Sequence, residues 1–300
     1  MDRPPDLGSL LTEQPNPASQ NLDALPTLEM LAVFQRQDRR VLEAVEKALP
    51  RIAEAVNAIA DCLRSGGRLF YIGAGTSGRL GVLDASECPP TFNVPPELVT
   101  AIIAGGNHAL RHSVEAVEDS PESGAADLLA HHFSPRDTLV GIAASGRTPY
   151  VLGAIDAANH LAALTVCIAC SPGSPLAARV RIPIELLTGP EVITGSTRLK
   201  AGTATKIVLN MLSSGVMVRL GYVYSNLMVN VRPLNAKLVD RARRIIAAVT
   251  GVPSPEAARL LEASGLSVPT AIVMGKLGLP REEAEARLAA CQGRIRDALQ

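Results

Sequence analysis

The chain has 300 residues, of which 47% are apolar and 19% charged, and its formal net charge is zero. This size and composition suit a globular protein with one large domain, or a domain with an appendage. Lysine and arginine are spread along the chain, so the sequence predicts no binding of nucleic acid or of an anionic membrane surface. No apolar run has the length of a membrane span, and five cysteines without a signal peptide favour a reducing compartment. We therefore expect a cytoplasmic protein that binds a small ligand.

The first part of the chain, up to about residue 26, is rich in Pro, Asn, Ser and Gln and is expected to form an extended arm. Apolar residues then recur at helical spacing over 27–63, which predicts a helix before the first strand. Five apolar runs follow, and they predict strands at 68–72, 98–104, 138–144, 164–170 and 182–187. Helical segments lie between most of them, so the expected fold is α/β, with a doubly wound parallel sheet covered on both faces.

Helices dominate the rest of the chain. One long helix is predicted after Gly202, and another from about 233 to 249. Beyond these, Pro253, Gly265 and Pro280 separate three short amphipathic helices, which predict a small C-terminal all-helical appendage. The expected organisation is an arm over 1–26, an α/β domain with a helical lead-in over 27–249, and a helical domain over 250–300.

Cys167 and Cys170 form a Cys-x-x-Cys pair inside the apolar run 164–170. A redox pair or a zinc site would use this spacing too, but no second pair and no histidine cluster supplies the remaining zinc ligands. We therefore interpret both cysteines as buried structural thiols and predict no metal.

A glycine turn, Gly73-Ala-Gly-Thr-Ser-Gly78, follows the first strand and opens a helix, as the G-x-G-x-x-G motif of dinucleotide-binding proteins does. A dinucleotide site would also need an acidic residue at the end of the second strand, where the sequence reads Ile102-Ile-Ala-Gly-Gly-Asn107. The hydroxyls of Thr76 and Ser77 at a helix N-terminus, with its free N–H groups, suit a phosphate or a polar sugar group. We therefore favour a sugar-phosphate site that includes Gly75, Thr76 and Ser77 over a nicotinamide site.

A second hydroxylated turn, Gly141-Ile-Ala-Ala-Ser-Gly-Arg-Thr-Pro149, also leaves an apolar strand and enters a helix. Its four candidate phosphate ligands are Ser145, Gly146, Arg147 and Thr148. The alternative is that Ser145 and Thr148 only cap the helix, with Pro149 in its first turn.

A third polar loop, 191–200, precedes the long helix and offers Ser196 and Lys200 as candidate ligands. Contact with a ligand and simple solvation of the start of the helix are equally good interpretations of this loop.

Two carboxylates are candidates for acid–base chemistry. Glu87 is expected at the end of the helix that starts at the glycine turn, because Pro89-Pro90 should stop that helix. The negative end of the helix dipole would favour a protonated carboxyl there, which suits a general acid or base, although an exposed helix-end glutamate fits as well. Glu118 follows Val114 by four residues and borders the apolar stripe of a predicted helix, whereas Glu115 is rotated away. The pattern alone favours Glu118 as an ordinary boundary residue.

Six stretches of the sequence together resemble one known family. They are Thr12-Glu-Gln-Pro-Asn16, Gly73-Ala-Gly-Thr-Ser-Gly-Arg79, Leu83-Asp-Ala-Ser-Glu-Cys-Pro-Pro90, 114–120, Gly141-Ile-Ala-Ala-Ser-Gly-Arg-Thr-Pro-Tyr150 and Thr194-Gly-Ser-Thr-Arg-Leu-Lys-Ala-Gly-Thr-Ala204. They look like the motifs of N-acetylmuramic acid 6-phosphate etherases, bacterial enzymes with a sugar isomerase (SIS) domain. The resemblance runs from the arm through about residue 250, and the run that ends at Pro90 is its most specific part.

The resemblance implies a carbon–oxygen lyase that splits N-acetylmuramic acid 6-phosphate into N-acetylglucosamine 6-phosphate and D-lactate during peptidoglycan recycling. Lactate would leave by elimination from the open-chain aldehyde, and water would then add. Glu87 matches the family's proton donor and Glu118 its second active-site carboxylate. The phosphate would lie in the turn 145–148, with Thr76 and Ser77 on the sugar. The family implies no metal or other cofactor, and a homodimer with the active site near the interface.

Two alternatives share the same architecture. A non-catalytic sugar-phosphate-binding regulator of the glucokinase regulatory type would keep both hydroxylated turns but need neither Glu87 nor Glu118. An aldose–ketose isomerase would share the base and the phosphate site, but it would have no use for an acid that faces C3 of the sugar. Many SIS domains have a serine where this chain has Ala143, which removes one phosphate hydroxyl, although the etherase motif itself includes this alanine.

Overall fold

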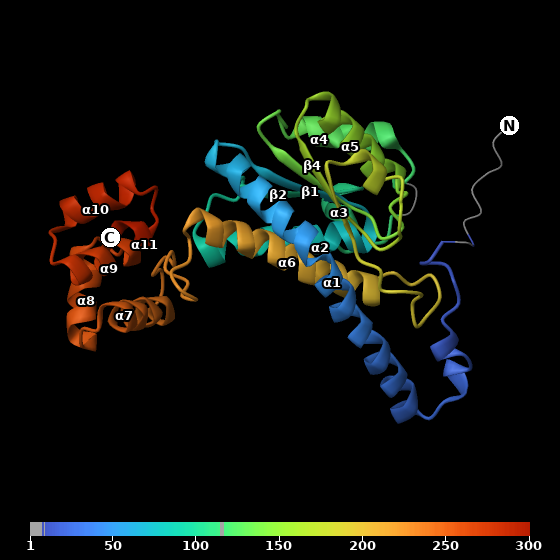
Figure 1. The fold of residues 1–300 in the computed structure, drawn as a ribbon, viewed down its shortest axis with the longest axis horizontal. Coiled ribbons are helices and arrows are strands. Elements are labelled where there is room, and N and C mark those ends of the chain that lie inside the picture. Colours follow the sequence, from blue (N-terminus) through green and yellow to red (C-terminus); the bar gives the residue numbers. More distant parts are fainter. Residues whose placement is uncertain (1–7, 9, 115–116) are drawn as a thin grey trace. The chain divides into compact units, whose positions relative to one another are not determined.

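The computed structural model describes residue 8 and residues 10–114 and 117–300 of the chain (Figure 1). The chain divides into two compact units. The first comprises the chain up to Ala85 together with Glu97–Ser213, and the second comprises Ser86–Pro96 with Ser214–Gln300. Of the helices that the structure describes, none has the length and apolar character that crossing a membrane would require.

The first unit is built on a five-stranded parallel sheet, which confirms the predicted doubly wound α/β class. Its strands are β1 (Leu69–Gly73), β2 (Val99–Ile103), β3 (Thr138–Ile142), β4 (Leu164–Ala169) and β5 (Ile182–Glu185). They lie in the order β2-β1-β3-β4-β5, and Gly73 at the end of β1 is paired with Ile142 at the end of β3. The order reverses between β1 and β3, so their carboxyl ends flank the crevice where such sheets bind ligands.

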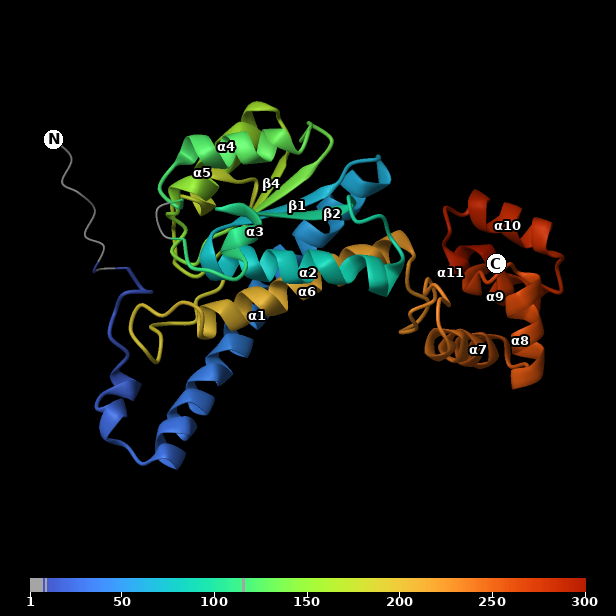
Figure 2. The same ribbon diagram turned by 180° about the vertical axis from the view of Figure 1, so that it is seen from behind.

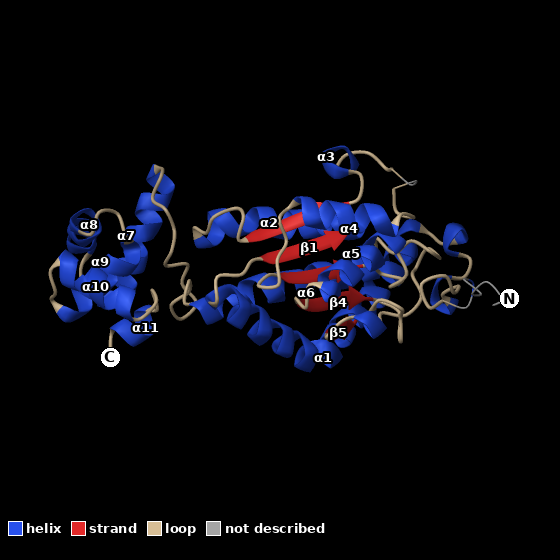
Figure 3. Ribbon diagram, turned by 90° about the horizontal axis from the view of Figure 1, so that it is seen from above, coloured by secondary structure: helices blue, strands red, loops and turns tan. Residues whose placement is uncertain are grey.

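Helices cover both faces of this sheet. Figures 1 and 2 show α4 (Pro121–Ala130) and α5 (Pro149–His160) on one face, and α1 (Thr27–Arg64), α2 (Gly75–Phe92) and α6 (Lys200–Leu220) on the other. Figure 3 shows the strands running side by side, with α1 beside β5. The helix α5 packs because its apolar residues recur every three or four positions, and Val151, Ala154, Ile155 and Ala158 are fully buried. Burial of each isoleucine or valine contributes roughly 2 kcal/mol to stability.

The second unit is helical. Its helices are α7 (Ala236–Thr250), α8 (Ser254–Ala263), α9 (Val268–Leu277), α10 (Arg281–Ala290) and α11 (Ile295–Ala298). Its apolar core includes Ile246, Leu261 and Ile272. The sequence suggested a boundary after residue 249, whereas the compact unit also contains α7. The reason is that Ala242, Ile245 and Ile246 on the apolar face of α7 are buried in the same core. The sequence did not predict the four-residue α11.

The structure corrects two helix predictions. The helix α2 does not stop at Pro89-Pro90 but continues to Phe92. Both prolines lie in its last turn, where each removes one helical N–H donor, and Asn93 N closes the turn by donating to Pro89 O at 2.9 Å. The helix predicted around Glu118 is also wrong for the described residues, because α3 spans only Gly106–Ala109. The chain at Glu118 instead pairs with the start of α5, through Tyr150 N and Glu118 O at 3.1 Å.

Candidate functional site

A pocket of about 220 Å³ opens at the carboxyl ends of β1 and β3. Six of the residues singled out from the sequence line it: Gly75, Thr76, Ser77, Glu118, Ser145 and Thr148. The other lining residues include six that the sequence analysis did not select: Thr12, Glu13, Gly195, Thr197, Gly202 and Thr205. The pocket therefore joins the two hydroxylated turns with the N-terminal arm and with the start of α6.

The turn after β1 presents the first turn of α2 to the pocket. A Cβ at Gly78 would lie 2.7 Å from the carbonyl oxygen of Gly73 and 2.6 Å from Cγ1 of Ile103, so only glycine lets α2 pack this closely. Gly75 has φ +50°, in the left-handed region that glycine tolerates. The N–H groups of Gly75, Thr76 and Ser77 have no acceptor within the helix, and the positive end of the helix dipole lies there. This turn can bind an anion or a polar sugar group.

The turn after β3 is held open by a second glycine. Gly146 has φ +64°, and a Cβ there would lie 2.2 Å from the hydroxyl oxygen of Ser174. Ser145 Oγ accepts a hydrogen bond from Arg147 N at 3.3 Å, so this hydroxyl also shapes the turn. Thr148 occupies the N-cap position of α5, but its side chain makes no capping hydrogen bond. Capping therefore does not explain Thr148, whose side chain lines the pocket.

Glu118 is half-buried and brings a carboxylate to the same pocket. Its Oε1 lies 3.2 Å from the position that a Cβ would take at Gly75. Its backbone is fixed by the hydrogen bond from Tyr150 N, and Tyr150 in turn donates its hydroxyl to Asp127 Oδ2 at 2.6 Å. Burial raises the pKa of Tyr150, so this hydroxyl stays a donor. Glu118 thus lies against the first turn and is anchored beside the second, while Glu115 lies outside the described residues.

Glu87 differs from Glu118 in its surroundings. It is exposed, belongs to the part of α2 that clusters with the second unit, and is not among the residues that line the pocket. The buried carboxylate of α2 is Asp84 instead, which is 5% exposed. The sequence carried a signal for this, because Gly81, Asp84, Ala85 and Cys88 recur at helical spacing and are all buried.

Asp84 links three elements of the first unit. It accepts hydrogen bonds from the Tyr71 hydroxyl of β1 at 3.0 Å, and from Asn210 Nδ2 and Ser213 Oγ of α6 at 2.7 and 3.2 Å. Burial raises the pKa of Asp84, although these hydrogen bonds act in the opposite direction. The network holds the first part of α2 in a fixed position against β1 and α6, and so orients the turn at Gly75.

Four of the predicted ligands do not line the pocket: Gly146, Arg147, Ser196 and Lys200. Lys200 is fully buried, and its Nζ donates to Thr188 O at 2.9 Å and to Gln37 Oε1 at 3.3 Å. Burial lowers the pKa of Lys200. Its ammonium group therefore links segments of the protein to one another. Ser196 does not line the pocket, but the residues on either side of it, Gly195 and Thr197, do.

Glu191 prepares the start of α6. It is buried, and its two carboxylate oxygens accept from Lys200 N at 3.0 Å and from Ala201 N at 2.9 Å. These N–H groups have no acceptor within the helix, so Glu191 acts as the cap of α6. The cap fixes Gly202 and Thr205, which face the pocket one turn later.

Cys167 and Cys170 are both buried, as expected for structural thiols. Burial raises the pKa of each thiol to about 12, which disfavours the thiolate that redox chemistry or zinc binding needs. Within 10–114 and 117–300, no cluster of three or more His, Cys, Asp or Glu side chains could hold a metal ion.

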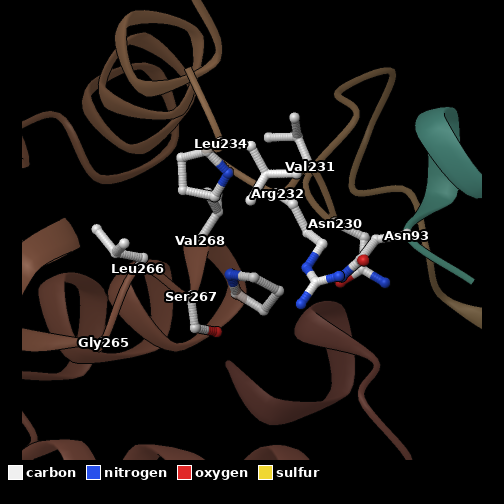
Figure 4. A pocket seen from close by; sticks show the side chains of 11 residues that line it. Asn93, Asn230, Val231, Arg232, Leu234, Gly265, Leu266, Ser267 and Val268 are labelled. Carbon is white, nitrogen blue, oxygen red and sulfur yellow. The ribbon is translucent and has the colours of Figure 1, made fainter. Parts of the chain in front are cut away.

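A second pocket, of about 340 Å³, lies within the second unit (Figure 4). Figure 4 shows the side chain of Arg232 extending toward Asn93 and Asn230. The hydroxyl of Ser267 also lines this pocket, but it caps α9 by accepting from Thr270 N at 3.3 Å. The Ser267 hydroxyl is therefore already used by the helix start.

Comparison with known proteins gives close relatives over nearly the whole chain. An N-acetylmuramic acid 6-phosphate etherase of Serratia proteamaculans is 53% identical over 98% of this chain and 99% of its own length. One of Cronobacter sakazakii is 54% identical over the same shares of the two chains.

More distant likenesses include a domain family and a solved structure. Residues 51–159 match the family described as the glucokinase regulatory protein N-terminal SIS domain. Among solved structures, a phosphoheptose isomerase from Francisella tularensis matches with a TM-score of 0.47 and 16% identity, over 65% of this chain and 100% of that one.

Proposed function

Because the chain belongs to the N-acetylmuramic acid 6-phosphate etherase family, we propose that it cleaves the lactyl ether of N-acetylmuramic acid 6-phosphate. The products are N-acetylglucosamine 6-phosphate and D-lactate, and the enzyme is a carbon–oxygen lyase of cell-wall amino-sugar recycling. The observation that carries the proposal is the pocket in which Glu118 meets two hydroxylated turns at the sheet's switch point. We place the reaction in the cytoplasm, where a charged sugar phosphate is retained because it does not cross a bilayer unaided.

The two turns divide the substrate between them. The phosphate binds at Ser145 and Thr148, where the N-terminus of α5 adds the positive end of its dipole. The polar groups of the sugar bind at Gly75, Thr76 and Ser77. In this orientation the reacting carbons lie between the turns, on the side of the pocket that Glu118 lines.

The chemistry requires two proton transfers. In the open-chain aldehyde the C2 proton is acidic, and a carboxylate removes it while an acid protonates the ether oxygen at C3. The C3–O bond then breaks, D-lactate leaves, and a C2=C3 double bond forms. Water adds its hydroxyl to C3 and a proton returns to C2, which gives N-acetylglucosamine 6-phosphate. Glu118 and Glu87 share these transfers, and general acid–base catalysis of this kind typically contributes about 10² to 10⁴ in rate.

We propose that Glu87 acts in the site of the partner protomer of a homodimer. The proposal is motivated by the exposure of Glu87 and by its absence from the residues that line the pocket. Exposed apolar side chains on α1 support a homodimer, because a second copy of the chain could cover them. Leu28, Leu31, Leu42 and Leu49 of α1 are exposed by 45% or more.

The test is incubation of the purified protein with N-acetylmuramic acid 6-phosphate and an enzymatic assay for D-lactate. The wild type should release one lactate for each N-acetylglucosamine 6-phosphate formed. The match of residues 51–159 to the glucokinase regulatory SIS domain favours one alternative, a regulator that binds sugar phosphates without turning them over. Binding of the substrate by folded protein without lactate release would support that alternative and exclude the etherase.

A further inference from the structure

The N-terminal arm contributes two polar side chains to the pocket, Thr12 and Glu13. Glu13 follows a tight turn in which its backbone N donates to Leu10 O at 2.9 Å. Its Oε2 lies 3.1 Å from the position that a Cβ would take at Gly195, which has φ +78°. The carboxylate of Glu13 therefore lies against the loop before α6. This loop is a separate segment from the two turns that bind the phosphate and the sugar.

A buried hydrogen-bond network fixes the arm in this place. Asn16 is 6% exposed, and its Nδ2 donates to Gln37 Oε1 and to Pro190 O, both at 2.9 Å. Gln37 Oε1 also accepts from the buried Lys200 Nζ. Asn16 thus joins the arm to α1 and to the loop at Pro190, and Gln37 joins it indirectly to Lys200 at the start of α6. The arm is thus part of the built site, and Glu13 is held three residues from its anchor.

The hydroxyl of Thr12 is a second observation that points to a ligand. Thr12 is 4% exposed, and among the described residues its Oγ1 has no hydrogen-bond partner. A buried hydroxyl without a partner destabilises a protein, so such groups are rare unless something else completes them. Thr12 lines the pocket, and a bound molecule there can supply the partner that the protein does not.

The charge of Glu13 restricts what it can bind. A carboxylate accepts hydrogen bonds and repels anions, so it cannot hold the phosphate or the lactyl carboxylate of the substrate. It fits a donor, such as a sugar hydroxyl or the acetamido N–H. We propose that Glu13 accepts a hydrogen bond from a hydroxyl or the acetamido N–H of the amino sugar, and that the Thr12 hydroxyl makes a second contact with it. This inference rests on the proposed function. The arm then acts as a binding element that helps to select the sugar.

The experiment measures binding of N-acetylglucosamine 6-phosphate by calorimetry, and lactate release as kcat and KM, in the full-length protein. Glu13→Ala should raise the Kd of the sugar phosphate and the KM about tenfold, the loss expected for one hydrogen bond to a charged group. The kcat should stay within about threefold, because the proton transfers are made by other residues. Glu13→Gln, which keeps one acceptor oxygen, should lie between Glu13→Ala and wild type.

Asp23→Ala is the matched control. It removes one negative charge from an exposed position of the same arm that does not line the pocket, so Kd and KM should equal those of wild type. Equal values for Glu13→Ala and wild type would overturn the inference, and so would a fall in kcat alone. If wild type released no lactate, the proposed function would fail, while the calorimetric comparison of Glu13→Ala with wild type would still decide the role of the arm.

Thr12→Val tests the buried hydroxyl without changing the shape of the side chain. If the hydroxyl serves the ligand, the variant should have an equal or higher melting temperature without ligand, but a several-fold higher Kd for N-acetylglucosamine 6-phosphate. An unchanged Kd would remove Thr12 from the binding site. A lower melting temperature with an unchanged Kd would show that the hydroxyl is structural.

Discussion

Both units of the chain contain pockets, and volume does not identify the candidate site. The pocket at the carboxyl ends of β1 and β3 has a volume of about 220 Å³, whereas a hollow beside Asp61, Cys62 and Arg136 of the same unit has about 440 Å³ and the pocket of Figure 4 in the helical unit has about 340 Å³. In the α/β unit, hydroxyls, free N–H groups and a carboxylate converge on one space at the switch point of the sheet. In the helical unit, the hydroxyl of Ser267 is used to cap a helix. Convergent polar groups, rather than volume, therefore distinguish a binding site from a surface hollow.

The interiors of the two units also differ in the polar side chains that they bury. The core of the helical unit consists of side chains such as Val268, Ile272 and Ala284. The α/β unit buries Asp84, Glu191 and Lys200, each with hydrogen-bond partners. Buried polar groups destabilise a fold unless they are paired, so they are informative where they occur. Here they hold α2, α6 and the arm, the segments whose ends form the site.

The largest expected effect is that of Glu118→Gln in the α/β unit. The amide keeps the size of the side chain but cannot take or give the proton, so kcat should fall about 10³-fold while KM stays within about threefold. Steady-state assays of lactate release measure both constants. Retained calorimetric binding of N-acetylglucosamine 6-phosphate controls for folding. A loss of less than about tenfold would mean that Glu118 is not an acid–base group.

Glu87 tests whether the reaction needs both protomers of the proposed homodimer. We expect Glu87→Gln and Glu118→Gln homodimers to be nearly inactive. A heterodimer of the two variants, isolated with two different affinity tags, has one site with both glutamates if Glu87 acts in the partner's site. Its activity should then be about half that of wild type. If Glu87 acted within its own chain, no site of the heterodimer would be intact and no activity would return. A monomeric molar mass of wild type in light scattering would contradict the homodimer itself.

A pair of helix-start substitutions sharpens the contrast between the pockets. Thr148→Val at the start of α5 should raise KM about tenfold through the lost contact to phosphate, with little change in melting temperature because Thr148 makes no capping bond. Ser267→Ala at the start of α9 should do the reverse, with an unchanged KM and a loss of about 1 kcal/mol of stability. Steady-state kinetics measures the KM of both variants, and thermal unfolding measures their stability. A raised KM in Ser267→Ala would bring the helical pocket into substrate binding.

The sequence predicted the α/β unit better than it predicted the composition of the site. Four of the five strands and α1 carried strong local patterns, the run at 182–187 was weaker, and both glycine turns led to pocket residues. The contribution of the arm could not be predicted, because it depends on the hydrogen bond from Asn16 to Pro190, 174 residues away. The burial of Lys200 was missed for the same reason, since its partner Gln37 lies on another helix. Long-range polar contacts leave no periodic signal in a sequence.

Glu118 shows how a wrong local prediction can lead to a correct placement. The helix expected around it does not form in the described residues, since the chain there pairs with the start of α5. The expectation that Glu118 is partly shielded from solvent nevertheless agrees with its half-buried position. For Glu87, the prolines were expected to end α2, but the helix continues through both of them to Phe92.

The smallest effect on activity is expected at the opposite end of the sheet, where Asp137 lies just before β3. It accepts hydrogen bonds from the backbone and guanidinium of Arg68 and from Ser134 N and Oγ, at 2.8 to 3.1 Å. Burial alone would raise the pKa of Asp137, but these bonds outweigh it and hold the pKa below its ordinary value of 3.8. A carboxylate with a lowered pKa stabilises the fold above that pH, and the contribution is lost as the pH falls through its folded pKa.

Asp137→Asn should therefore destabilise the α/β unit by about 2 kcal/mol near neutral pH. The difference from wild type should shrink as the pH falls below 3.8, where the wild-type carboxylate takes up its proton. Urea unfolding of the variant and of wild type at a series of pH values measures this difference in the free energy of unfolding. The activity at neutral pH should not change, since Asp137 does not line the pocket. Asp61→Asn, at an exposed carboxylate of α1, is the control and should change stability little at any pH. A pH-independent difference for Asp137→Asn would assign the loss to packing rather than to charge.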